Sequence, residues 1–416
     1  MEPTLKGAMA LVRGASGPLS PHLPAFVASL IDQSYAVVCV RAKTWHAVAF
    51  DGWLAKERVD LVDVANPHIE RFHRRAYRRR SDCQAEPLRH ESTDLRQLLR
   101  YLREHKLCGA EPSNGLPADA LVARFEQFLL RDRGLAVSTV RGYRAPVRAF
   151  LVHRFDGEDV DLGVLHARDV QGFVQRQARR LRPRALKQVV SALRAFLRYA
   201  EYRGDVGATL IGAVPAVAVW ATTPPLPRAI SAEHARRTIA SCDPTNAVGL
   251  RDRAILLVLS RLGLRGGEVI KLLLDDVDWD SGHLSIRGKN RHECLMPLPA
   301  DVGEAIAAYL KAGRPVTADR HLFVRTRAPF RGFKHDSDGI GSLVRNALQR
   351  AGVDAPHKGS HQFRHALAVR MLQEGASLPE IGELLRHRSP MATSIYARVD
   401  LVALRALALP WPGSAS

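Results

Sequence analysis

The chain has 416 residues, 46% of them hydrophobic, and its 61 Lys and Arg against 42 Asp and Glu give a formal net charge of +19. This length exceeds what one hydrophobic core usually organises, so two or three domains are expected, and the hydrophobic fraction argues against wholesale disorder. The positive charge favours a polyanionic partner, with nucleic acid ahead of an anionic membrane surface.

The cysteines and the apolar segments indicate the cellular compartment. The five cysteines (Cys39, Cys83, Cys108, Cys242 and Cys294) are odd in number and form no C-x-x-C pair. This arrangement predicts neither a disulfide framework nor a zinc site, and it fits a reducing cytosol. No apolar run reaches 18 residues, and the opening MEPTLKGAMALVRGASG lacks the apolar core of a secretory signal. We therefore expect no membrane partner.

The N-terminal half of the chain contains an internal repeat. Three matches occur in the same order: 35–50 with 135–150, 59–61 with 160–162, and 95–101 with 193–199. One such match could arise by chance, but three in register favour a duplicated helical unit. We expect an extra N-terminal unit over residues 1–112 and a second copy over 117–210.

The second copy is predicted to be a small helical bundle. Apolar residues recur at helical spacing in two runs, Leu121, Phe125, Phe128 and Leu129, then Val140, Tyr143, Val147 and Phe150. Four basic residues, Arg180, Arg182, Arg184 and Lys187, lead into the apolar helix VVSALRAFLRYA. The apolar positions are expected in the core. The basic residues are candidates for phosphate contacts, although some will be ordinary solvated charges.

A breaker-rich stretch separates the repeat from the rest of the chain. Residues 215–231 hold four prolines, which predicts an extended linker over 211–229 and a further domain over 230–416. Ser231 is the expected N-cap of the first helix of that domain. A buried helix is predicted to run from Ile255 to Leu262 and to end at Gly263.

After Gly263 the pattern changes from helix to hairpin. Arg265 follows at a tight turn, and GGEVIKLLLDDV predicts another helix with Glu268 in its first turn. The stretches HLSIR (283–287) and CLMPL (294–298) predict a β-hairpin with Lys289 in its loop. A lone Arg and a lone Lys in such places are most often surface charges.

Two short motifs near the end of the chain carry further polar side chains. In HQFRH, His361 and Arg364 lie one helical turn apart, which taken alone is an ordinary solvated face. In RHRSPMATSIYAR, His387 precedes Tyr396, and Ser389 followed by proline predicts the N-cap and first residue of a short helix that carries the tyrosine.

These motifs, taken in order, resemble a known family. LGLRGGEVIKLLLDDVDW, a GK turn, HQFRH, LLRHRS and TSIYARV together resemble the tyrosine recombinase (phage integrase) family, whose catalytic set is Arg, Lys, His, Arg, His or Trp, and Tyr. The resemblance implies the catalytic residues Arg265, Lys289, His361, Arg364, His387 and Tyr396 (nucleophile). It covers 230–410, and 117–205 resembles the family's helical core-binding domain. Three positions depart from the usual pattern: Asn290, Phe363 and Arg386.

Breaking a phosphodiester needs a nucleophile, charge neutralisation and a proton for the leaving alkoxide. Arg265 and Arg364 would clamp the two non-bridging oxygens. Tyr396 would attack phosphorus, with His361 as the base because a phenol needs help to ionise at neutral pH. Lys289 would protonate the departing 5′-oxygen, and His387 would hydrogen-bond the phosphate. His365 is interpreted as structural.

The resemblance implies a 3′-phosphotyrosyl intermediate and reversal by a partner strand. Because the covalent link keeps the phosphodiester energy, no ATP is required, and no Walker-type motif occurs in the sequence. We expect no cofactor and no metal, since Glu268, Asp275, Asp276 and Asp278 fit helix and loop structure better than a magnesium site.

The predicted fold is mainly α with a small antiparallel sheet (α+β), in which duplicated helical units grip one face of double-stranded DNA and the catalytic domain closes the other. The family resemblance implies a homo-tetramer, or a hetero-tetramer with related recombinases, on DNA in a bacterial-type cytoplasm. The apolar tail, 399–416, is expected to dock into a neighbouring subunit, although packing against its own domain is the simpler alternative.

The leading hypothesis is a site-specific recombinase, most plausibly the integrase or transposase of a mobile element. One competitor is a DNA-binding accessory protein of the same fold that does not cut DNA. Another is a topoisomerase that uses the same chemistry without needing a particular site. A covalent adduct that depends on Tyr396 separates the first from the second, and sequence preference separates the first from the third.

Overall fold

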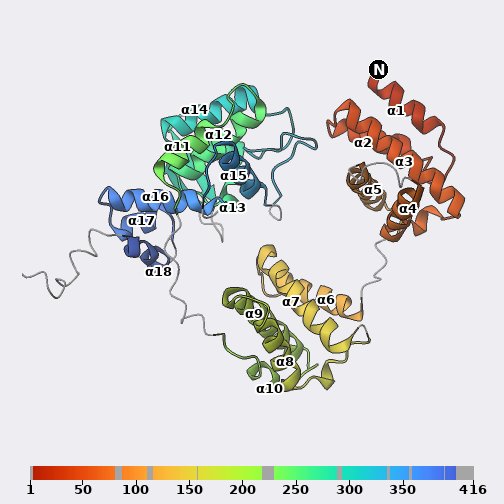
Figure 1. The fold of residues 1–416 in the computed structure, drawn as a ribbon, viewed down its shortest axis with the longest axis horizontal. Helices are drawn as coiled ribbons and strands as arrows, with labels where there is room; N and C mark the ends of the chain where they lie inside the picture. Colours follow the sequence, from red (N-terminus) through yellow and green to blue (C-terminus); the bar gives the residue numbers. More distant parts are fainter. Residues whose placement is uncertain are drawn as a thin grey trace, which may run out of the picture. The chain divides into compact units, whose positions relative to one another are not determined.

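The structure is a computed structural model that describes residues 3–79, 87–109, 116–156, 158–217, 229–287, 293–334, 338–355, 358–387 and 389–399 (Figure 1). The chain divides into two compact units. One contains Met1–Asp32 and Ala36–Thr223, and the other contains Pro224–Ser416 together with Gln33–Tyr35. Among the described residues, no helix is both long and apolar enough to cross a membrane.

The first part of the N-terminal unit is all helical. Its elements are α1 (Pro3–Arg13), α2 (Leu23–Asp32), α3 (Val37–Glu57), the 3-10 turn η1 (Leu61–Asp63), α4 (Asn66–Arg79) and α5 (Pro87–Glu104). The buried carboxylate of Asp51 on α3 accepts hydrogen bonds from the backbone N–H groups of Gly17 and Leu19. These bonds satisfy backbone donors between α1 and α2 and tie that connection to α3.

The second part repeats the order from α2 to α5 and adds one short helix at its end. It consists of α6 (Pro117–Arg131), α7 (Val137–Phe155), η2 (Leu162–Val164), α8 (Ala167–Ala178), α9 (Pro183–Tyr202) and α10 (Thr209–Gly212). The expected apolar positions form one core, in which Phe125, Val147 and Phe150 are fully buried. Leu210, the last residue of the predicted domain, also belongs to this core, and so does Val214, so the start of the predicted linker packs onto the domain. Residues 218–228 of that linker lie outside the described residues.

Aromatic pairs at matching positions support the proposed duplication. Phe50 and Phe72 meet edge to face with ring centroids 5.4 Å apart at 70°, and Phe150 and Phe173 do so at 5.4 Å and 71°. The pairs sit on α3 and α4 in one copy and on α7 and α8 in the other. Two residues thus keep both their sequence register and their packing geometry.

A second aromatic contact and the residues that end the helices match between the copies as well. Phe26 and Tyr101 lie 5.3 Å apart between α2 and α5, whereas Phe125 and Tyr199 lie 5.4 Å apart between α6 and α9. Left-handed residues follow the equivalent helices at three pairs of places: Ser34 and Gly134, Arg58 and Asp156, and Lys106 and Gly204. Such residues end helices by turning the chain away from the axis.

The C-terminal unit combines helices with a small sheet. Its elements are α11 (Ala232–Ala240), α12 (Ala247–Arg261), α13 (Gly266–Val269), η3 (Leu274–Asp276), β1 (Val277–Asp278), β2 (His283–Arg287), β3 (Glu293–Pro297), α14 (Ala300–Ala308), η4 (Tyr309–Gly313), α15 (Gly339–Arg350), α16 (His361–Gln373), α17 (Leu378–Leu384), α18 (Pro390–Thr393) and η5 (Ser394–Val399). The sheet is antiparallel in the order β1-β2-β3, with Ser285 opposite Leu295. The fold class is therefore the predicted one.

Several local predictions for this unit are confirmed. The Ser231 side chain accepts from the His234 backbone N–H at the start of α11. The buried helix α12 ends at Arg261, and Gly263 follows it in the left-handed region at φ 58°. The predicted hairpin is β2 and β3.

Two predictions were wrong in extent. The helix expected over GGEVIKLLLDDV is only one turn, α13, because the chain then becomes extended. The Leu322 N–H donates to the Leu272 carbonyl and the Leu274 N–H donates to the Arg320 carbonyl, so this stretch pairs with a distant segment. The sheet also has a third strand, β1, that was not predicted. It contains only Val277 and Asp278, and two residues are too few to show an alternating pattern.

Candidate active site

Arg265 is positioned by the turn that ends α12. Gly263 has φ 58°, and a Cβ there would meet Leu385 at 2.8 Å and Leu367 at 2.9 Å, so the turn requires glycine. Arg265 then serves as the N-cap residue of α13 in extended conformation. Its Nη1 donates to Glu268 Oε1 at 2.7 Å, and its backbone N–H donates to Glu268 Oε2 at 2.9 Å. The guanidinium is thereby held half-exposed at the surface of the unit.

Arg364 is buried beneath this turn, in the first part of α16. Its Nη1 donates to the Gly263 carbonyl at 2.6 Å, and its Nη2 donates to the Leu385 carbonyl. Burial, together with the nearby Arg265 and Arg386 guanidiniums, lowers the pKa of Arg364 to about 10. Positive groups crowded in this way favour a bound anion, because an anion offsets their mutual repulsion.

Tyr396 lies on η5, directly after the short helix α18. The predicted start of that helix is confirmed, since the Ser389 side chain accepts from the Met391 N–H and proline occupies the first turn. The Tyr396 side chain is only 1% exposed. Burial raises the pKa of its hydroxyl, although the Arg364 and Arg265 charges act in the opposite direction. The phenol therefore needs a proton acceptor to react near neutral pH.

Two histidines contact the ring or hydroxyl of Tyr396. His365 Nδ1 lies 2.9 Å from the Tyr396 hydroxyl, within hydrogen-bond distance. The His387 ring stacks parallel to the tyrosine, with centroids 6.4 Å apart at an angle of 5°. The Nδ1 of His387 lies 2.7 Å from Thr393 Oγ1, which fixes the orientation of its imidazole.

The surroundings of both predicted histidines favour their neutral forms. Burial and the Arg364 and Arg265 charges lower the pKa of His387 to about 4. The pKa of His361 is also lowered, by burial first and then by Arg364 and Arg265, against a smaller opposite effect of Glu268. A neutral imidazole can donate one hydrogen bond and accept another, as a base beside a phosphate must.

The structure brings together five of the six predicted site residues. Arg265 lies just before α13, His361 and Arg364 lie on α16, His387 lies between α17 and α18, and Tyr396 lies on η5. The charges of Arg265 and Arg364 act to lower the pKa of each of the other three. The sixth, Lys289, lies outside the described residues. The C-terminal tail from residue 400 onward also lies outside them.

Sequence reasoning missed the contact made by His365, which it interpreted as structural. His361 and His365 are four residues apart on α16, so both can reach the same side of the helix, and their rings are 6.4 Å apart. That spacing was visible in the sequence. The contact between His365 and Tyr396 was not, because η5 is brought to α16 only by tertiary packing.

The arrangement has a definite chemical capability. A buried phenol touches an imidazole, and two guanidiniums with one carboxylate between them create a region of positive charge beside it. Such a site can bind an oxyanion, take a proton from the phenol and stabilise the charge that develops when phosphorus is attacked. These features fit a candidate phosphoryl-transfer site in which Tyr396 is the candidate nucleophile.

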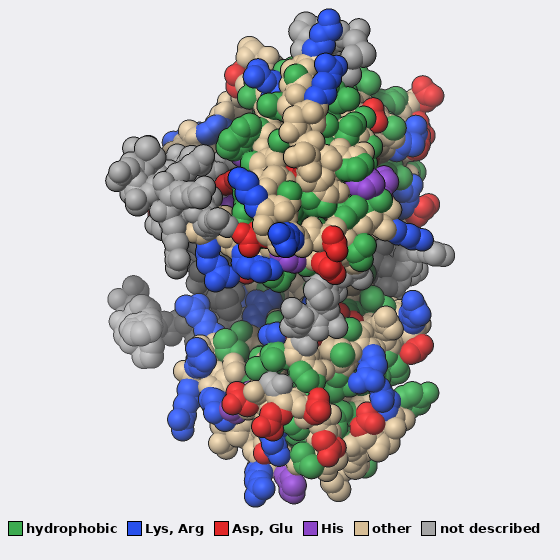
Figure 2. Space-filling view, turned by 90° about the vertical axis from the view of Figure 1, so that its right-hand side faces the viewer, with side chains coloured by type: hydrophobic (Ala, Val, Ile, Leu, Met, Phe, Trp, Pro, Cys, Tyr) green, Lys and Arg blue, Asp and Glu red, His purple; other side chains and the backbone are tan. Residues whose placement is uncertain are grey.

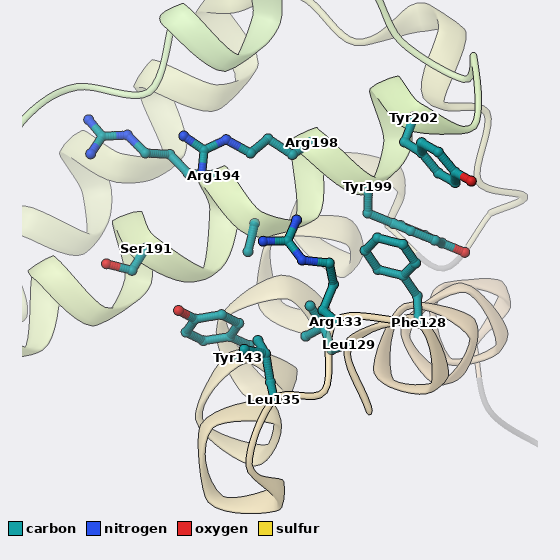
Figure 3. Close-up of a pocket in the computed structure, with 11 residues that line it drawn as sticks. Phe128, Leu129, Arg133, Leu135, Tyr143, Ser191, Arg194, Arg198, Tyr199 and Tyr202 are labelled. Atoms are coloured by element: carbon teal, nitrogen blue, oxygen red, sulfur yellow. The ribbon is translucent and has the colours of Figure 1, made fainter. Parts of the chain in front are cut away.

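The helical domain over α6–α10 offers a second candidate surface, here for binding nucleic acid. A hollow of about 490 Å³ is lined by residues of α6, the α6–α7 connection, α7 and α9, and its basic members are Arg133, Arg194 and Arg198 (Figure 3). Aromatic rings line it as well: Phe128, Tyr199 and Tyr202 on one side and Tyr143 on the other. None of the described residues that line this hollow is acidic. Arginine beside aromatic rings suits nucleic acid.

On the equivalent surface of the first copy, a carboxylate offsets the positive charge. Asp94 stands where the second copy has Ala192, and it is paired with Lys43, which matches Tyr143. His46 Nδ1 lies 2.9 Å from the same carboxylate. On the face drawn in Figure 2, lysine and arginine side chains are interspersed with acidic and hydrophobic ones.

Comparisons with known proteins agree with the fold. The model described as "Phage integrase family" matches residues 228–401, and "Phage integrase, N-terminal SAM-like domain" matches residues 122–204. "Putative integrase/recombinase y4rA" of Sinorhizobium fredii is 44% identical over 410 residues, which cover 98% of each chain. "Tyrosine recombinase XerD" of Listeria innocua is 26% identical over 294 residues, 68% of this chain and 96% of that protein.

Solved structures show the same fold. The XerH site-specific recombinase bound to palindromic difH substrate, in a post-cleavage complex, has a TM-score of 0.54 at 18% identity and covers 69% of this chain and 83% of that chain. The lambda integrase tetramer bound to a Holliday junction has a TM-score of 0.50 at 16% identity and covers 67% and 76%.

The chain belongs to the tyrosine recombinase family, also called the phage integrase family. Members of this family break and rejoin DNA, and this chain is a site-specific recombinase acting on DNA. The helices over residues 122–204 are its SAM-like core-binding domain, and the unit that carries Tyr396 is its catalytic domain.

Proposed function

We propose that this recombinase cuts DNA through a 3′-phosphotyrosyl bond to Tyr396 and serves as the integrase or transposase of a mobile element. One observation supports the chemistry above all others. The Tyr396 hydroxyl is buried against His365 within the field of Arg364 and Arg265, the arrangement that a tyrosine nucleophile requires.

The proposed reaction exchanges one phosphoester for another. The Tyr396 oxygen forms a bond to the scissile phosphorus while the bond to the 5′-oxygen of the next nucleotide breaks. Arg265 and Arg364 neutralise the non-bridging oxygens, and His361 and His387 donate hydrogen bonds to them. Lys289 gives a proton to the leaving 5′-oxygen. A free 5′-hydroxyl of a partner strand reverses the step without ATP or a metal.

The route of the tyrosine proton is revised by the geometry. The sequence assigned the base to His361, but His365 is the imidazole within hydrogen-bond distance of the hydroxyl. Because a base must reach the proton it takes, we assign the first transfer to His365 and place His361 beside the phosphate, where it faces the same arginines.

Similarity along the whole chain supports the biological role. The integrase/recombinase relative from Sinorhizobium fredii matches 98% of this chain, whereas the XerD relative matches only 68% of it. The match to the protein named as an integrase thus includes the additional N-terminal copy, whereas the match to XerD leaves part of this chain uncovered. We propose integration or transposition for this chain on that ground.

We also propose that four subunits act together on DNA, either four copies of this chain or a mixture with related recombinases. Lambda integrase is a tetramer in its solved structure with a Holliday junction, and this chain shares its fold. The tail from residue 400 would dock into a neighbour. Truncation after Ala397 tests this directly, because a truncated protein that still assembles fully on DNA contradicts docking in trans.

The decisive experiment uses a suicide substrate with a nick near the cleavage site in end sequences of the host element. Wild-type protein should form a denaturation-resistant adduct, and Tyr396→Phe should form none while still binding the DNA. A DNA-binding accessory protein, the alternative function, would form no adduct in either version. Relaxation of unrelated supercoiled DNA would instead favour a topoisomerase.

A further inference from the structure

Arg386, the residue before His387, has an unusual backbone conformation. It lies at φ 55°, in the left-handed region that favours glycine, just after α17. Four other described residues apart from glycine have positive φ: Ser34, Arg58, Lys106 and Asp156. Those four are exposed, whereas the Arg386 side chain is only 15% exposed. A large, charged and mostly buried side chain therefore occupies a position where glycine would be less strained.

The side chain adds a second cost. Its Nε is buried and has no hydrogen-bond partner among the described residues. Its Nη1 donates to the Leu384 carbonyl at 3.1 Å and lies against the sulfur of Met296. A strained backbone and an unpaired buried donor both lower stability. Some interaction elsewhere on the guanidinium must offset them.

That interaction is with the carboxylate that holds Arg265. Arg386 Nη2 donates to Glu268 Oε2 at 3.0 Å, and Arg265 Nη1 donates to Glu268 Oε1 at 2.7 Å. Burial disfavours the ionised carboxylate, but the Arg265 backbone hydrogen bond, the Arg386 charge and the Arg265 side chain prevail and lower the pKa of Glu268. One buried carboxylate is thus shared by two guanidiniums.

We infer that Arg386 is a positioning residue for the cleavage reaction. Glu268 orients Arg265, but its negative charge alone would also cancel much of the attraction between Arg265 and a phosphate. By binding the other carboxylate oxygen, Arg386 offsets that charge, so Arg265 stays fixed in place and remains electrostatically available. This inference rests on the proposed function, since Arg265 is assigned there to the scissile phosphate.

The structure provides a variant that separates this role from a purely structural one. Arg386→Gly keeps the left-handed turn, and with it the path of the chain into His387, while removing the guanidinium. Its thermal unfolding midpoint should stay near the wild-type value, because glycine relieves the backbone strain while the ion pair with Glu268 is lost. Its single-turnover rate of adduct formation on saturating suicide substrate should nevertheless fall, by roughly 10–100-fold as for other partners that orient a charged site.

Two further variants complete the test. Arg386→Lys keeps the positive charge and should recover part of the rate. Glu268→Gln combined with Arg386→Gly removes both charges, so it should be faster than Arg386→Gly alone. An Arg386→Gly protein that is as fast as wild type, or a double variant that is no faster than the single one, overturns the inference. If wild-type protein forms no adduct at all, the proposed function fails instead.

Discussion

His365 Nδ1 lies 2.9 Å from the Tyr396 hydroxyl, so an imidazole that sequence reasoning set aside as structural is the side chain in contact with the proposed nucleophile. The two residues come from α16 and η5. Their contact joins the helix that carries Arg364 to the turn that carries the tyrosine, and it places a proton acceptor at the hydroxyl.

This contact predicts the effect of changing each histidine of α16. His365→Gln should slow adduct formation on a suicide substrate by about 10²–10⁴-fold, the usual contribution of a general base. His361→Gln should also slow it, but through weaker phosphate stabilisation. Replacing one non-bridging oxygen with sulfur should therefore change the His361→Gln defect and leave the His365→Gln defect unaltered. The opposite pattern would return the base role to His361.

Much of the site was predictable because its residues belong to short motifs with local structure. Arg265 follows a helix-ending glycine, Arg364 lies one turn after His361, and Tyr396 follows a serine–proline helix start. Each of these features depends on neighbours within a few residues. The helical repeat was visible for the same reason, since core residues on matching helices keep the same register.

The parts that could not be predicted depend on contacts between distant segments. The helix expected after Gly266 stops after one turn because Leu272 and Leu274 pair with residues near Arg320. The bridge from Arg386 through Glu268 to Arg265 joins residues 118 positions apart. Tertiary contacts of this kind override local propensity and leave no periodic signal in the sequence.

A second prediction concerns Gly263, which needs glycine both for its φ of 58° and for space. Gly263→Ala should destabilise the protein by about 1–2 kcal/mol from the backbone alone and by roughly 1–3 kcal/mol more from crowding against Leu385 and Leu367. Denaturant unfolding measures the loss. The variant should also cleave DNA more slowly, because the Gly263 carbonyl accepts the hydrogen bond that holds Arg364 Nη1.

Two other glycines of the same unit serve as matched controls. Gly282 has φ 67° but open space around it, so Gly282→Ala should show the backbone cost alone. Gly267 lies in α13 with open space and no positive φ, so Gly267→Ala should stabilise by about 0.5–1 kcal/mol. Equal losses at Gly263 and Gly282 would show that crowding at Gly263 is relieved by movement.

The pKa shifts of the site histidines predict how stability depends on pH. His387 binds a proton near pH 6.5 when unfolded but only near pH 4 when folded, and the pKa of His361 is lowered in the same direction. The unfolded state therefore binds more protons between these values. The contribution of these histidines to the free energy of unfolding should be fully present above pH 6.5 and should be lost as the pH drops toward 4. Thermal unfolding midpoints at several pH values measure this loss.

Two comparisons test the origin of that loss. His387→Gln should show a smaller drop in midpoint between pH 7 and pH 5 than wild type. A bound DNA duplex should also reduce the drop, because a phosphate beside the histidines favours their charged forms. A drop of the same size in wild type and His387→Gln would mean that other groups control the acid sensitivity.

A fourth prediction concerns Lys289, whose role is derived from the sequence. If it protonates the leaving 5′-oxygen, Lys289→Ala should cut ordinary DNA slowly but should cut DNA with sulfur at that bridging position at nearly the wild-type rate. A thiolate leaves without a proton, so the missing acid no longer matters. Tyr396→Phe should not be rescued by the same substrate. Failure of the sulfur substrate to rescue Lys289→Ala would remove the acid role.

The duplication supplies a matched pair of arginines for the last prediction. Arg198 on α9 and Arg100 on α5 occupy the same place in the repeat, and both are exposed. Arg198 lies at a hollow whose described lining residues include no acidic side chain, whereas Asp94, six residues before Arg100 on α5, is paired with Lys43 and His46. Arg198→Ala should weaken DNA binding and reduce the salt dependence by about one phosphate contact.

Arg100→Ala should have a smaller effect on both quantities, because the acidic residue makes its face less attractive to phosphate. Fluorescence anisotropy with a site-containing duplex at several salt concentrations measures affinity and slope together. Equal losses for the two variants would show that the first copy grips DNA as strongly as the second. No loss for Arg198→Ala would place the DNA-binding face of the core-binding domain elsewhere than the hollow between α7 and α9.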